Sequence, residues 1–126
     1  MHFYKEGGDK MVFSMTNAVN NSIVAMKRDT AGMLSDAEVY MTHGNGTGAQ
    51  TVDPLGSQGS VILSGDDRFL FTVNAGSNNI SSFLVRQGRL MLVDVAYSGG
   101  FRPNSLATID NFLYVTNSGD ATHPSN

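Results

Sequence analysis

The chain has 126 residues, of which 40% are hydrophobic, with a formal net charge of −3 and no cysteine. The lack of thiols excludes disulfides, thiolate metal sites and cysteine nucleophiles, and the mild charge with scattered basic residues argues against nucleic acid or an anionic membrane as a partner. No apolar run approaches the ~18 residues of a membrane span and the N-terminus lacks a secretory apolar core, so we expect a cytoplasmic protein.

Strand-forming residues alternate with clusters of Gly, Asn, Asp and Ser along the whole chain, and no window carries a helical stripe. In chain order, the pattern predicts strands at 2–6, 11–16, 22–28, 36–42, 60–64, 69–74, 79–86, 90–97, 104–108 and 112–117. The sequence therefore predicts an all-β protein.

One strand-and-turn unit recurs along the chain. Phe69–Asn74 is repeated in Phe112–Asn117 and more loosely in Val12–Asn17, and a shift of 43 residues also sets Leu63 on Leu106. The first spacing is longer, 57 residues, because of an insertion. A period near 43 residues is the length of one four-stranded antiparallel blade of a β-propeller.

The repeat divides this single propeller segment, residues 1–126, into a first blade at about 2–43, a long crossover loop at 44–59, a second blade at about 60–98 and a partial third blade at about 102–126. Closed propellers typically need four to eight blades, so the chain predicts an incomplete ring. Open blade faces and unpaired edges invite association. We therefore expect either part of a longer propeller or a homo-oligomer that completes the ring with other copies.

Four turn and loop segments carry a family resemblance: Val12–Ala18, Asp53–Ser60, Val73–Asn78 and Ser98–Ser105. They resemble the lactonase-type seven-bladed β-propellers, which include propeller-type 6-phosphogluconolactonase and carboxymuconate-cyclase-like proteins. The resemblance covers about residues 11–120. It implies carbohydrate metabolism, hydrolysis of a sugar lactone and no cofactor, although many members share the propeller without an assigned reaction.

Arg102 is the first candidate catalytic residue. It ends the crossover between blades two and three, and the blade offset sets it opposite Gly59 at the entrance of an inner strand. A guanidinium there would clamp the carboxylate or phosphate of an anionic sugar lactone, and the resemblance implies a similar role. The alternative is a surface arginine held beside Pro103 by turn geometry.

His43 is the second candidate, because a neutral imidazole could act as general base on a lactone-attacking water. Its place at the end of an outer strand argues against that role unless the following loop folds inward. The other histidines, His2 and His123, lack strand or helix spacing with it, so we expect no metal site. Family members credited with lactone hydrolysis tend to carry a His near the Arg102 crossover, whereas residues 101–104 contain none.

Polar residues around the two crossovers form the predicted substrate-binding set: Ser57, Gln58, Asn104 and Asp53. The first three suit a polyhydroxylated or carboxylated small molecule. Asp53 lies in the long loop, where it is a candidate general base or cation ligand without an Asp-x-Asp partner. In contrast, the Asp residues between first and second strands, and the Asn residues that end each second strand, are expected to serve turn chemistry.

Three functions stay open at this point. The chain is a lactone hydrolase with Arg102 as anchor, a non-catalytic binding or scaffold propeller, or a propeller fragment that assembles with its own copies. The third is compatible with either of the others, because assembly would rebuild a channel.

Overall fold

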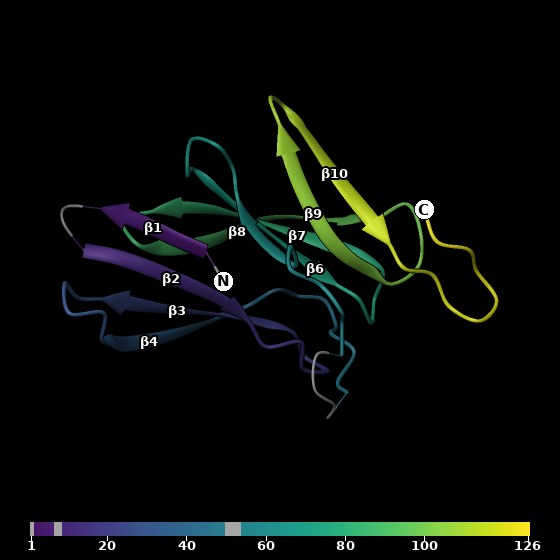
Figure 1. The fold of residues 1–126 in the computed structure, drawn as a ribbon, viewed down its shortest axis with the longest axis horizontal. Helices are drawn as coiled ribbons and strands as arrows, with labels where there is room; N and C mark the ends of the chain where they lie inside the picture. The colour runs from purple at the N-terminus through teal and green to yellow at the C-terminus, as the bar shows by residue number, and fades with distance from the viewer. Residues whose placement is uncertain (1, 7–8, 50–53) are drawn as a thin grey trace.

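The computed structural model describes the backbone of residues 2–6 and 9 and the complete residues 10–49 and 54–126. Its strands are β1 (His2–Glu6), β2 (Asp9–Met15), β3 (Ser22–Arg28), β4 (Leu34–Met41), β5 (Val61–Leu63), β6 (Phe69–Asn74), β7 (Asn79–Arg86), β8 (Arg89–Tyr97), β9 (Pro103–Ile109) and β10 (Phe112–Asn117). They form a first sheet, β1-β2-β3-β4, a second sheet, β5-β6-β7-β8, and the hairpin β9–β10, all antiparallel (Figure 1). The all-β class is confirmed, and each sheet follows chain order as the blades of a propeller do.

Strand β6 shows why these residues form a layered sheet. Leu70 and Thr72 point toward the first sheet, while Phe71 and Val73 point toward the hairpin β9–β10, as strand alternation requires. Leu70, Thr72 and Val73 are fully buried. Both faces of the strand are buried, because the first sheet covers one and the hairpin β9–β10 covers the other.

Two apolar clusters hold the sheets together. The first lies between the two four-stranded sheets and includes Phe13 and Ile23 from one side and Leu70 and Phe83 from the other. The second lies between the second sheet and the hairpin and is made of Ile62, Val73, Ile80 and Leu106, with Val115 packed against it. Burial of each large side chain contributes about 1.5–3 kcal/mol, so these clusters fix how the sheets stack.

The pairing of β2 corrects the sequence alignment of the first repeat. Ile80 pairs with Val73 in the second sheet, whereas Ile23, its counterpart, pairs with Met15 in the first. The offset is therefore 58 residues in β2, not 57. As a result, Asn17 lies beyond the strand, in a left-handed conformation with φ 54°, instead of ending it as Asn74 does.

The alternation of strand direction gives the molecule two ends. At the crossover end lie residues 42–49 and 54–60, before β5, and residues 98–102, before β9, together with the loops after β2, β6 and β10. At the hairpin end lie the turns at 29–33, 64–68, 87–88 and 110–111. Loops at the entrances of inner strands line the channel mouth of a propeller, so the crossover end is where the predicted site belongs.

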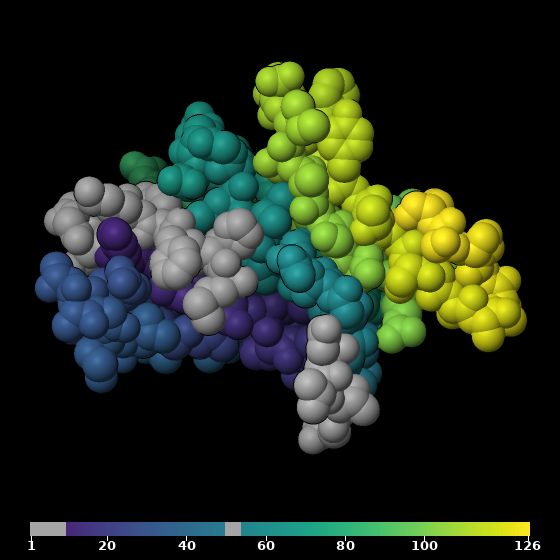
Figure 2. Space-filling model, in the orientation of Figure 1, coloured from purple at the N-terminus to yellow at the C-terminus, as the bar shows by residue number. Residues whose placement is uncertain are grey.

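The hairpin β9–β10 projects away from the two four-stranded sheets (Figures 1 and 2). Its outer face carries Ile109, Phe112 and Tyr114, which are 62%, 67% and 55% exposed. At the same positions of β6, Phe69 and Phe71 are partly buried, and Phe71 packs against the apolar cluster that the second sheet shares with the hairpin. The outer face is thus an apolar surface without a neighbour among the described residues.

Candidate functional site

The entrances of the two inner strands lie side by side at the crossover end. The N–H of Leu106 in β9 donates a 2.8 Å hydrogen bond to the carbonyl of Gly59, just before β5. Gly59 sits so close to Ser105 and Leu106 that a side chain there would displace them. The segment that precedes β5 therefore lies beside the first half of β9, which places Ser57 and Gln58 in one region with Asn104. Arg102 reaches the same segment through its contact with Pro54.

The backbone of Arg102 is held by hydrogen bonds, and its side chain is exposed. It adopts a left-handed conformation with φ 61°, and its N–H donates to Asn78 Oδ1 at 2.7 Å. Its carbonyl accepts 3.0 Å hydrogen bonds from both the N–H and the hydroxyl of Ser118. The guanidinium Nη2 lies 3.4 Å from the carbonyl of Pro54, in an exposed contact. The arginine is thus an accessible cation on a constrained backbone, beside the end of the long crossover.

The polar residues of the predicted set are partly engaged by local structure. Ser57 Oγ accepts a 3.2 Å hydrogen bond from the N–H of Gly59, and Asn104 Oδ1 accepts one of 3.0 Å from Thr116 in β10. Gln58 is exposed. Asp53 lies outside the described residues. The substrate-binding role of this set stays a prediction.

His43 lies at the outer end of the long crossover, immediately after Thr42, and is exposed. Its φ of 58° is left-handed, at the position where the second crossover has Gly99 with φ 80°. Its role as general base stays a prediction, and the argument against it from its outer position still holds.

The first half of the long crossover is pinned to the turn that follows β2. Gly46 and Gly48 donate to the carbonyls of Ala18 and Asn17 at 2.8 and 3.0 Å. The amide of Asn17 accepts from the N–H of Thr47 at 2.9 Å and donates to its hydroxyl at 2.7 Å. These hydrogen bonds hold the first half of the long crossover against the turn after β2.

The asparagines that end the second strands hold each crossover in place. Asn74 Oδ1 accepts from Thr42 Oγ1 at 2.8 Å and Asn21 Nδ2 at 2.9 Å, and its Nδ2 donates to Asn79 Oδ1 and Ser81 Oγ, both at 2.8 Å. The contact with Asn79 fits the predicted turn chemistry, but the contacts with Asn21 and Thr42 join segments far apart in the sequence.

Asn117 repeats this contact one sheet later. It accepts from Ser98 Oγ at 2.8 Å and donates to the carbonyl of the same serine at 3.2 Å. Gly44 and Gly100 pack directly against Asn74 and Asn117, respectively, with no room for a Cβ atom. Each crossover is thus bound to the end of the second strand of the sheet or hairpin that follows it, β6 for the first crossover and β10 for the second.

His123, which is not among the predicted site residues, lies against the same crossover. The ring of His123 stacks on Phe101, with centroids 3.5 Å apart and an interplanar angle of 14°. Its Nδ1 lies 2.8 Å from Asp120 Oδ1. Hydrogen bonds from the N–H of Thr122, and then from the His123 side chain, lower the pKa of Asp120 to about 2. The spacing Asp-x-x-His was visible in the sequence, but nothing in it placed this loop beside Arg102.

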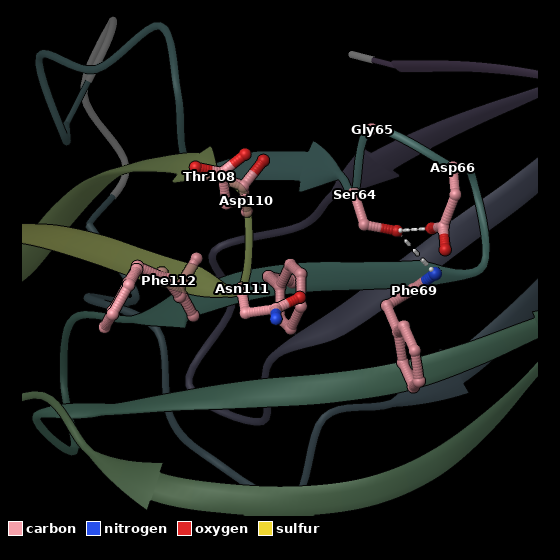
Figure 3. A pocket seen from close by; sticks show the side chains of 10 residues that line it. Ser64, Gly65, Asp66, Phe69, Thr108, Asp110, Asn111 and Phe112 are labelled. Carbon is pink, nitrogen blue, oxygen red and sulfur yellow. Dashed lines mark hydrogen bonds between the residues drawn. The ribbon is translucent and has the colours of Figure 1, made fainter.

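A cleft of about 540 Å³ opens at the opposite, hairpin end, between the turn before β6 and the β9–β10 turn (Figure 3). Ser64 Oγ donates to Asp66 Oδ1 at 2.6 Å, which lowers the pKa of this carboxyl, and Asp66 also accepts from the N–H of Arg68. These bonds confirm the predicted turn chemistry of Asp66. The cleft also includes Asp110 and Phe112, but none of the predicted site residues line it.

The described part of the chain has neither a metal-binding cluster nor a membrane-spanning helix. No three His, Cys, Asp or Glu side chains gather there as ligands for a metal ion. No helix in residues 2–6, 9–49 and 54–126 has the length and apolar character needed to cross a membrane.

The comparisons with known proteins agree with this architecture. The family model described as lactonase, 7-bladed beta-propeller matches residues 1–122. The comparisons with curated proteins and with solved structures found no match. Because the family model spans nearly the whole chain, the resemblance seen in the crossover and turn segments is confirmed, and the chain belongs to the lactonase family of seven-bladed β-propellers.

Proposed function

We propose that the crossover end binds a sugar lactone that carries a carboxylate or phosphate and promotes its hydrolysis to the hydroxy acid. Membership of the lactonase family supports the reaction class. The observation that carries the proposal is Arg102, an exposed guanidinium at the entrance of β9 whose backbone is fixed by Asn78 and Ser118. A cation on a constrained backbone binds an anion with less entropic cost than one on a mobile loop.

In this proposal the anionic group lies against the Arg102 guanidinium through paired hydrogen bonds. Ser57, Gln58 and Asn104, from the same region, supply uncharged donors and acceptors for the sugar hydroxyls. Water attacks the lactone carbonyl, the ring ester bond breaks, and the ring oxygen leaves as a hydroxyl group. The binding contacts contribute by holding the carbonyl in place for attack.

The test compares a phosphorylated and a neutral lactone of the same sugar. We expect Arg102→Gln to lower kcat/KM for 6-phosphogluconolactone about 100-fold and to change that for glucono-δ-lactone much less, because only the first needs the cation. Hydrolysis is followed by NMR, with the uncatalysed rate subtracted.

Arg86→Gln is the matched control, since Arg86 is an exposed arginine that ends β7 at the hairpin end. It should leave both rates unchanged. Equal losses in the two arginine variants, or no hydrolysis of either lactone by the unaltered chain, would contradict the proposal.

A second candidate function is assembly through the open sheet faces, with or without turnover. The observation in its favour is the exposed outer face of the hairpin, formed by Ile109, Phe112 and Tyr114. The face of the first sheet that points away from the second carries Val39 and Met41, which are 64% and 48% exposed. These two faces have the composition of the inner faces that already pack within the chain, so a second copy of the chain is the occupant that we propose.

A further inference from the structure

The geometry points to Asp120 and His123 as a general-base pair beside Arg102, with His123 taking the proton of the attacking water. This inference rests on the proposed lactone hydrolysis and supplies what the sequence lacked, an acid–base group near the anion-binding arginine. Neither residue belongs to the set predicted from the sequence.

The loop that carries the pair is bound to the crossover that carries Arg102. Ser118 donates twice to the Arg102 carbonyl, and Gly119 donates to the carbonyl of Phe101 at 2.9 Å. At its far end, Asn126 exchanges hydrogen bonds of 2.6 and 3.0 Å with Asn117. The loop is therefore anchored at both ends, and its middle is held against the residue next to Arg102.

The imidazole is oriented by three contacts. Stacking on Phe101 fixes the plane of the ring, and the 2.8 Å contact between Nδ1 and Asp120 Oδ1 fixes its rotation. Thr122 Oγ1 lies 3.0 Å from the same Nδ1. Because Asp120 is a carboxylate, Nδ1 is the protonated nitrogen in this contact, and Nε2 is the nitrogen that accepts a proton. The His123 and Asp120 side chains are 41% and 43% exposed, so water reaches the pair.

Asp120 also closes a local turn, and that role alone does not account for the arrangement. It accepts hydrogen bonds from the N–H groups of Thr122 and His123, both at 2.8 Å. Asp29 closes a similar turn at the hairpin end, with bonds of 2.9 Å from Ala31 and Met33, and no imidazole meets its carboxylate. The stacked histidine on the carboxylate is what distinguishes the loop beside Arg102.

The proposed step balances without a further reactant. His123 Nε2 takes a proton from water as its oxygen bonds to the lactone carbonyl carbon, and the negative charge moves to the carbonyl oxygen. When the intermediate collapses, the bond to the ring oxygen breaks and the imidazolium returns the proton to that oxygen. Asp120, ionised throughout, stabilises the imidazolium, while the Arg102 cation binds the substrate anion.

The test is the pH profile of lactone hydrolysis by the whole chain and two variants. For the unaltered chain, kcat/KM for 6-phosphogluconolactone should rise with pH as the general base loses its proton. His123→Gln should lower kcat about 100-fold, leave KM within about twofold and remove this rise. Asp120→Asn should lower kcat about tenfold and keep the rise, because the imidazole stays but loses its orienting partner.

Asp29→Asn is the matched control, since it changes the same kind of turn at the opposite end and should leave the profile unchanged. Thermal unfolding of each variant shows whether the fold is retained. A chain that hydrolyses the lactone while His123→Gln retains full kcat overturns the general-base pair and leaves the proposed function standing. Binding of the lactone is measured separately, from the imidazole NMR signals of His123. If the chain neither binds nor hydrolyses the lactone, both the general-base pair and the proposed function are overturned.

Discussion

At the scale of single residues, Asn74 is the polar group on which the most contacts depend. Its side-chain amide is fully buried and makes four hydrogen bonds, two of which join the first sheet and its crossover to the second sheet. Buried groups that lose their partner cost about 1–3 kcal/mol each. We therefore expect Asn74→Ala to lower the free energy of unfolding by about 3 kcal/mol, measured by urea denaturation.

Two other asparagines calibrate that result. Asn117→Ala should cost about 1 kcal/mol, because Asn117 makes both of its side-chain hydrogen bonds to one residue, Ser98. Asn20→Ala, in an exposed turn, should stay within about 0.5 kcal/mol. A cost for Asn74→Ala no larger than that for Asn20→Ala would show that these buried amides do not hold the sheets together.

At the scale of elements, the loop at 118–125 should loosen in acid. The pKa of Asp120 is about 2, below its usual value, because the N–H of Thr122 and the His123 side chain bond its ionised form. A carboxyl with a depressed pKa contributes stability that is present above its unfolded pKa, near 4, and is lost as the pH falls to about 2. The amide NMR signals of Thr122 and His123 should therefore titrate with a midpoint near pH 2.

Asp120→Asn should abolish this transition, because an amide does not titrate. A midpoint near pH 4 in the unaltered chain would mean that the loop gives no support to the carboxylate. That outcome would also weaken the contact on which the proposed His123 pair depends.

The elements differ in how far the sequence could predict them. The strands were predictable because strand residues alternate with turn residues, and β6, β7 and β10 begin and end at the predicted residues. The one-residue offset in β2 was not, because Thr16 and Asn17 both match a strand end in sequence and only the pairing of Met15 with Ile23 decides between them. Phe13 consequently faces the second sheet, where it is buried.

The candidate site was less predictable than the strands. Arg102 and Asn104 follow from the repeat, because the offset places them at the entrance of an inner strand. His123 does not, because its position depends on Ser118 and Gly119 bonding back to the crossover, contacts between segments about 16 to 18 residues apart. No local pattern around the Asp-x-x-His spacing predicts that this loop bonds back to the crossover.

At the scale of the whole molecule, the uncovered sheet faces favour association with other copies of the chain. Within the chain, Phe71 of the second sheet packs against the apolar cluster shared with the hairpin, but the equivalent Tyr114 of the hairpin and its neighbour Phe112 are exposed. A face of a few hundred Å² is worth on the order of 10 kcal/mol when buried, before the costs of association. The outer face of the hairpin differs from the outward face of the first sheet. Copies that pair these two faces would therefore associate head to tail, as in a ring or an open filament.

Light scattering across a concentration series tests this association. We expect the mass of the unaltered chain in solution to exceed the monomer mass of 13.5 kDa. The double variant with Phe112→Lys and Tyr114→Lys should have the monomer mass, because burial of the face would desolvate two ammonium groups. Met33→Lys is the matched control, since Met33 is as exposed as Phe112, at 67%, but lies in a turn away from that face. A monomer at every concentration, or equal dispersal by Met33→Lys, would show that the hairpin face does not bind a second copy. A head-to-tail assembly that disperses only with the double variant would mean that blade packing within the chain also operates between chains.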